Sequence, residues 1–172
     1  LPPLATTSFS AWWRRRGGAT GPGTEGDVAL LIDPFTNYNH PEIGVAAVEL
    51  FERLGLRVAA AVAIDDGRAA ISKGLHQAAR RAAERTTRTL LSLAGAGLPL
   101  VGLEPSSLLT LRDEYYHLLP GDERVPAVAR QAVTFEEFMA GLLGEDVRPR
   151  FTAAPRRVLL HGHCHQKALV GT

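Results

Sequence analysis

The residues best suited to chemistry stand near the end of the sequence, where three histidines surround the only cysteine. A short apolar run, Val158-Leu159-Leu160, comes directly before them and predicts a buried strand. In α/β folds, functional side chains gather beyond the carboxyl ends of strands. Imidazole and thiolate are suitable ligands for zinc or iron, so this stretch is a candidate metal site. The candidate ligands are His161, His163, Cys164 and His165.

Two other interpretations of the same stretch are open. In extended backbone the histidines would share one face and Cys164 would lie on the other. With no C-x-x-C or H-E-x-x-H spacing, one or two of the histidines could simply hydrogen-bond neighbouring loops. A Cys164 thiolate activated by a histidine would be a nucleophile. The opposite faces of adjacent residues argue against that pairing.

Two further polar loops follow predicted strands and should lie at the same edge of the sheet. Asp65-Asp66-Gly67-Arg68 offers paired carboxylates, which can bind a hard cation or share a proton, although such a sequence is also typical of a turn. Glu104-Pro105-Ser106-Ser107 places two hydroxyls at a predicted helix start. That position suits an anion or, more simply, a helix cap.

Apolar runs and helical periodicity alternate along the chain. The predicted strands are residues 28–32, 56–62, 98–103 and 158–160. The predicted helices are residues 41–54, 71–93 and 105–116, followed by two short segments, 125–133 and 135–143, the second capped by Thr134. Residues 33–40 are predicted to be a polar loop. This alternation favours a mainly parallel sheet with right-handed crossovers, in a three-layer α/β sandwich.

An internal echo relates the two ends of the chain. Residues 28–35 and 158–165 share a plan of apolar run followed by a polar turn, and Pro34 stands where Cys164 stands. This predicts one structural unit and the start of a second.

Composition limits the class of protein. The 172 residues carry a formal charge of +1, so nothing in the overall charge favours nucleic acid. No apolar stretch approaches the roughly 20 residues that span a bilayer. One cysteine cannot form an internal disulfide, and the cytoplasm is the expected compartment. Residues 1–26, rich in Pro, Gly, Ser, Thr and Arg, are predicted to be a flexible linker, with Trp12 and Trp13 packed on a neighbouring surface. Residues 27–172 form the predicted domain.

Several stretches together resemble the cysteine-rich CCG domain of heterodisulfide reductases and of the iron–sulfur subunits of glycolate oxidases. The resemblance is greatest to the C-terminal part of fused FAD-linked oxidase and iron–sulfur proteins, and it covers about residues 26–172. The stretches that carry it are residues 35–42, 67–75, 101–106, 108–115 and 161–167.

The resemblance implies a duplicated unit whose cysteines hold iron–sulfur clusters. In the first unit, every cysteine position of that pattern is replaced. The residues found there are Pro34, Asp65, Asp66 and Ser107. They do not substitute for thiolates, so the first cluster site should be empty. Cys164 matches the opening cysteine of the second unit and could be a cluster ligand in a longer protein. The chain alone should hold no cofactor.

The resemblance therefore implies a C-terminal fragment of an oxidoreductase that uses FAD and a 4Fe-4S cluster, similar to 2-hydroxy-acid dehydrogenases and inactive by itself. Its partners would be the flavin and ferredoxin-like domains of the longer protein. The electron acceptor, and peripheral membrane association of the longer protein, are left open. The alternatives are a non-redox binding or structural module with a vacated pocket at Asp65, Asp66, Ser106 and Ser107, or a small His/Cys metal site.

Overall fold

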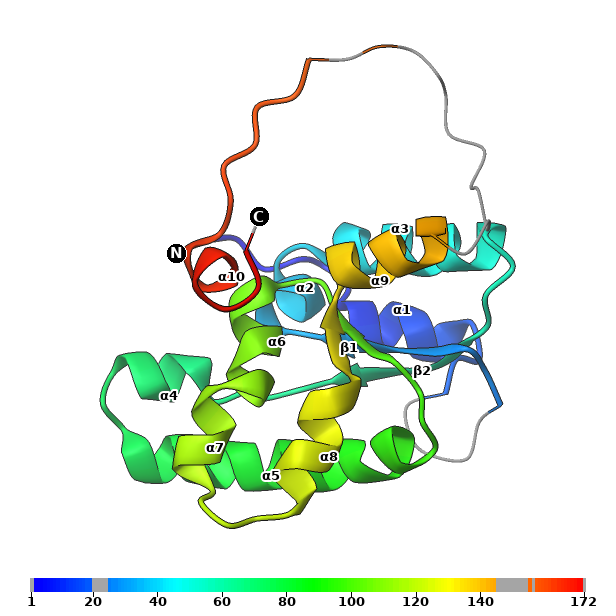
Figure 1. Ribbon diagram of the computed structural model, residues 1–172. Coiled ribbons are helices and arrows are strands. Elements are labelled where there is room, and N and C mark those ends of the chain that lie inside the picture. The colour runs from blue at the N-terminus through cyan, green and yellow to red at the C-terminus, as the bar shows by residue number, and fades with distance from the viewer. Residues whose placement is uncertain (1, 20–24, 145–154, 156, 172) are drawn as a thin grey trace.

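Four parallel strands form the centre of the fold in the computed structural model, which describes residues 2–19, 25–144, 155 and 157–171. They are β1 (Val28–Ile32), β2 (Val58–Ala63), β3 (Leu100–Gly102) and β4 (Ala132–Thr134). Their order in the sheet is β2-β1-β3-β4, with every neighbouring pair parallel. Helices cover both faces of the sheet, which confirms the three-layer α/β sandwich (Figure 1).

The strands match their sequence signal because the sheet is covered on both faces. All five residues of β1 are buried, as the continuous apolar run Val28–Ile32 predicts for a strand between two helical layers. Three of the four predicted strands are present, although β2 and β3 are shorter than expected. Strand β4 was not predicted, because its three residues lie at the end of a segment with no apolar run of its own.

Two helical layers enclose the sheet. One layer contains α1 (Phe9–Arg15), α3 (Pro41–Arg53) and α9 (Phe135–Gly144), which pack through residues such as Phe51 and Met139. The other contains α5 (His76–Gly95), α6 (Pro105–Arg112), α7 (Glu114–Leu118) and α8 (Arg124–Gln131). Three short helices complete the described chain: α2 (Pro34–Tyr38), α4 (Arg68–Ser72) and α10 (Cys164–Leu169). Among the described helices, none is long and apolar enough to cross a bilayer.

Three predicted elements are corrected by local backbone chemistry. The expected loop after β1 contains helix α2, because the Asp33 side chain accepts the N–H groups of Phe35 and Thr36. The expected helix over residues 71–93 is two helices, α4 and α5, separated at Gly74, whose φ of 68° is left-handed. The expected helix over residues 105–116 is interrupted at Asp113, between α6 and α7.

The prediction of a flexible linker over residues 1–26 is wrong for the stretch that forms α1. Ser8 caps this helix by accepting the N–H of Ala11. Phe9 and Trp13, four residues apart on one helical face, are only 1% and 4% exposed and belong to the core. The prediction that the tryptophans pack on a neighbouring surface is confirmed for Trp13. The linker prediction rested on composition, which does not take account of the four-residue spacing between Phe9 and Trp13.

The predicted strand Val158–Leu160 is absent. These residues form no ladder with any described strand, and their exposed fractions are 81%, 102% and 81%. The similarity between the two stretches is found instead in the short helices that follow them. Pro34 and Cys164 each occupy the first position of a short helix, after Asp33 and His163 respectively. The shared plan is therefore a helix start, without a second strand among the described residues.

The predicted cap of α9 is confirmed and forms a reciprocal pair. The Thr134 hydroxyl accepts the Glu137 N–H at 3.2 Å, and the Glu137 carboxylate accepts the Thr134 N–H at 2.8 Å. Thr134→Ala should lower the free energy of unfolding by about 1 kcal/mol, because it leaves the Glu137 N–H without its acceptor. Urea unfolding measures this, and Thr134→Ser, which keeps the hydroxyl, should be near wild type. Equal losses in both variants would contradict the cap.

Candidate functional site

The polar residues at the carboxyl ends of the strands form the candidate site. The chain places β2 on one side of β1 and then returns to place β3 on the other side. The order in which strands are added therefore reverses between β1 and β3. Ligand sites of α/β sheets lie at such a change. A crevice too narrow for a water molecule lies here, between Asp33 after β1, Glu104 after β3 and Ser107 of α6. The sequence predicted this edge correctly for the Asp65–Arg68 and Glu104–Ser107 loops.

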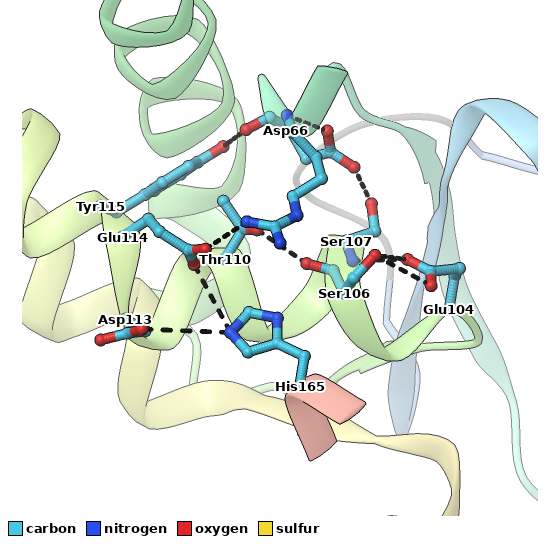
Figure 2. A network of polar contacts seen from close by, with 10 residues as sticks. Asp66, Glu104, Ser106, Ser107, Thr110, Asp113, Glu114, Tyr115 and His165 are labelled. Atoms are coloured by element: carbon cyan, nitrogen blue, oxygen red, sulfur yellow. Dashed lines mark hydrogen bonds and ion pairs between the residues drawn. The ribbon is translucent and has the colours of Figure 1, made fainter. Parts of the chain in front are cut away.

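Asp66 is the buried centre of the site, with 6% of its surface exposed. Its Oδ1 accepts the Arg68 N–H at 2.7 Å, and its Oδ2 accepts the Ser107 hydroxyl (Figure 2). The Tyr115 hydroxyl donates to the Asp66 carbonyl at 3.1 Å. The next position favours glycine, because Gly67 has a φ of 79° and lies against α5. The Asp-Asp-Gly sequence is therefore a turn that aims one carboxylate inward.

Burial is the main cause of the raised pKa of the Asp66 carboxyl. Desolvation, followed by the neighbouring charges of Asp65, Glu104 and Asp33, raises the pKa of Asp66 to about 6. The N–H of Arg68 acts in the opposite direction and lowers the pKa. The site thus contains a carboxyl group that titrates close to neutral pH.

The residues at the four replaced cysteine positions do not converge on one ligand site. Asp66 and Ser107 bond to each other, whereas Asp65 is exposed and pairs with Arg85 at 2.8 Å. Pro34 is exposed, opens α2 and offers no ligand atom. An iron–sulfur cluster does not fit these positions, because the inward-facing oxygens are hard ligands already used in a direct hydrogen bond.

The start of α6 is capped from within the chain. The Glu104 carboxylate accepts the Ser107 N–H at 2.5 Å and the Ser106 hydroxyl at 2.8 Å. A negative charge therefore already occupies the position where an external anion would bind. Of the two interpretations of this loop, the helix cap is correct, with Glu104 rather than a serine as the capping residue.

The histidines near the chain's end lie beside α6 and the start of α7. Helix α10 packs on α6 (Figure 1), which places the His165 Nε2 3.7 Å from Glu114 Oε2 and 4.0 Å from Asp113 Oδ2. The His163 Nε2 lies 3.8 Å from Glu104 Oε1. The expectation of alternating faces in extended backbone is wrong from Cys164 onward, because Cys164 begins a helix.

The structure brings together a different set of potential ligands from the predicted one. Across the described residues, one group of three or more potential ligands has its ligand atoms within 4.8 Å of one another: Asp113, Glu114 and His165. His165 is the single member that it shares with the four predicted ligands, since His161 and Cys164 are exposed elsewhere on this segment. Asp113 and Glu114 look like solvated helix charges in the sequence. No sequence signal reveals the helix break that aims them at α10.

The sequence of the chain is similar to parts of several known proteins. It is 34% identical to D-2-hydroxyglutarate dehydrogenase of Pseudomonas putida over 146 residues, which are 85% of this chain and 14% of that protein. Some of its relatives are dehydrogenases. It is also 32% identical over 151 residues to lactate utilization protein A of an Exiguobacterium species, covering 84% of this chain and 59% of that protein.

A more distant relative is one subunit of the anaerobic glycerol-3-phosphate dehydrogenase of Escherichia coli, 24% identical over 171 residues, covering 98% of this chain and 42% of that protein. No protein-family model matches the sequence, and no solved structure matches it either. The names of the relatives agree with the oxidoreductase part of the resemblance, while the CCG domain remains a prediction. The chain spans about one seventh of the D-2-hydroxyglutarate dehydrogenase that it matches.

Proposed function

We propose that this chain is a C-terminal domain of a longer oxidoreductase that uses FAD and iron–sulfur clusters to dehydrogenate a 2-hydroxy acid. The match to D-2-hydroxyglutarate dehydrogenase over 85% of the chain carries this proposal. The match to lactate utilization protein A supports it, because lactate is also a 2-hydroxy acid. The flavin and ferredoxin-like domains of the longer protein would be its partners.

Within that protein, the domain supports electron transfer without holding a cluster at its first site. The Asp66–Ser107 hydrogen bond and the Asp65–Arg85 ion pair stand where the resemblance places thiolates. These contacts stabilise the turn after β2 against α5 and α6. The domain itself would then serve as a rigid surface that fixes the relative positions of the neighbouring domains.

A second candidate is a non-redox binding module. Its ligand would enter the crevice between the ends of β1 and β3, which is too narrow to admit a water molecule and includes only Ser107 of the four residues expected to line the vacated pocket. Its polar groups are largely paired with one another, as the capping bonds of Glu104 illustrate. An external ligand would have to displace those bonds, which makes the redox-domain proposal the better supported of the two.

Iron, acid-labile sulfide, flavin and the visible spectrum, measured after anaerobic purification, test the proposal. The longer protein that contains this chain should be brown and contain iron and FAD, whereas the 172-residue chain should contain neither. In the longer protein, Cys164→Ala should remove the iron of one cluster. Asp66→Asn and Ser107→Ala are matched variants at the replaced positions and should leave the iron content unchanged. A longer protein without iron or flavin would favour the binding module.

A further inference from the structure

We propose that Asp113, Glu114 and His165 bind a zinc ion that joins the C-terminal helix α10 to the junction of α6 and α7. This site differs from the His/Cys set that the sequence suggests, and it uses no residue that the resemblance assigns to an iron–sulfur cluster. Its ligands come from two segments that lie far apart in the sequence and side by side in the fold.

The three ligand atoms face a common point. The His165 Nε2 lies 3.7 Å from Glu114 Oε2 and 4.0 Å from Asp113 Oδ2, and all three atoms lie within 4.8 Å of one another (Figure 2). Zinc binds histidine nitrogen and carboxylate oxygen at about 2.0–2.2 Å, so ligand atoms around a tetrahedral ion lie about 3.3–3.6 Å apart. Small side-chain rotations would bring the present arrangement to that spacing.

A buried carboxylate oxygen without a hydrogen-bond partner in the described parts of the chain supports a cation site here. Within the described residues, the Oε2 of Glu114 is buried and accepts no hydrogen bond, while its other oxygen accepts one from Arg68. The His165 side chain is only 13% exposed; its Nδ1 is the buried ring atom without a described partner, whereas its Nε2 faces the two carboxylates at 3.7 and 4.0 Å, too far for hydrogen bonds. Leaving the Glu114 Oε2 buried and unpaired costs free energy, which a metal ion bound to that oxygen would remove.

Charge and access also suit a divalent ion. Asp113 and Glu114 supply two negative charges, and the Arg68 guanidinium at the far oxygen of Glu114 fixes the orientation of that carboxylate. Partners behind the ligating atoms commonly hold metal ligands in place in this way. Asp113 is 44% exposed at its side chain, which leaves an open side for entry and for a water as the fourth ligand.

Zinc titration by calorimetry, and Co²⁺ absorption as a spectroscopic probe, test the site on the whole chain after treatment with a chelator. We expect one ion per chain, with affinity reduced at least tenfold by His165→Gln and by Asp113→Asn. His161→Gln and Cys164→Ser alter exposed neighbours and are the matched controls, which should bind as the wild type does. Zinc should also slow hydrogen exchange of the α10 amides in the wild type and not in His165→Gln.

Two results would overturn the site. One is the absence of saturable, stoichiometric zinc binding by a folded wild-type chain. The other is binding that persists in His165→Gln but disappears in Cys164→Ser, together with a thiolate-to-cobalt charge-transfer band, which would move the ion to the cysteine. Thermal melting in chelator, where both His165 and Asp113 variants should match the wild type, separates a lost ligand from a lost fold.

Discussion

Replacing Asp66 with asparagine should make the protein more stable at neutral pH and remove the part of its pH dependence that comes from this carboxyl group. The asparagine keeps the shape of the site, because its oxygen can accept the Arg68 N–H and its amide can donate to the Ser107 hydroxyl. It cannot ionise. At pH 7 and above, the variant should therefore exceed the wild type in free energy of unfolding by up to about 3 kcal/mol, which corresponds to the difference between pKa values of about 6 and 3.8.

The sign of the change in stability with pH depends on whether the folded or the unfolded protein binds the proton more tightly. The folded pKa of Asp66 is about 6 and the ordinary value for an aspartate is 3.8, so between these limits the folded chain binds more protons than the unfolded chain. Stability must then fall as the pH rises through this window. The contribution of the protonated carboxyl is complete below pH 3.8 and is lost above about pH 6.

Urea unfolding at several pH values, taken as the difference between wild type and Asp66→Asn, isolates this group from the others that titrate. The two proteins should be similar at about pH 4 and diverge by about pH 7, on either side of the folded pKa. Asp65→Asn is the comparison variant: it removes an exposed neighbouring charge that helps to raise the pKa of Asp66, so it should keep the pH-dependent behaviour of Asp66 but make it smaller. A constant difference across this range would mean that Asp66 is not a buried titrating group.

The sheet and its chemical edge could be predicted because they depend on local patterns. Val28–Ile32 is apolar throughout, which suits a strand buried on both faces. The parallel arrangement follows from the alternation of strands with helices, and it brings the residues after β2 and β3 to one edge. The capping pair of Thr134 and Glu137 is likewise a short-range signal.

The rest depends on tertiary packing that no short pattern encodes. The apolar run Val158–Leu160 has the composition of a strand, yet a strand exists only when a neighbouring strand supplies its hydrogen bonds. The helix break at Asp113 turns a charged segment toward α10, and the position of α10 itself is set by contacts with α6. The candidate zinc site lies where these two unpredicted features meet.

Trp13→Ala should be among the most destabilising single substitutions outside the sheet. Trp13 is 4% exposed, lies in the same core cluster as Phe51 and donates its Nε1–H to the Ala19 carbonyl at 2.6 Å. Truncation removes a large buried ring and leaves a cavity that the surrounding helices cannot fully close. We expect a loss of about 3–5 kcal/mol, a substantial part of the total stability of a domain of this size.

Trp12→Ala is the matched control, because it changes the adjacent tryptophan on the same helix. Trp12 is only partly buried, and the Arg16 guanidinium lies 5.0 Å from its ring centroid. A cation–π contact at an exposed site contributes about 0.5–1 kcal/mol, so this variant should lose less than half as much stability as Trp13→Ala. Urea unfolding followed by far-UV circular dichroism measures both. If residues 9–15 were part of a linker, both substitutions would change the unfolding midpoint little and by similar amounts; a large loss for Trp13→Ala alone would establish that this segment belongs to the core.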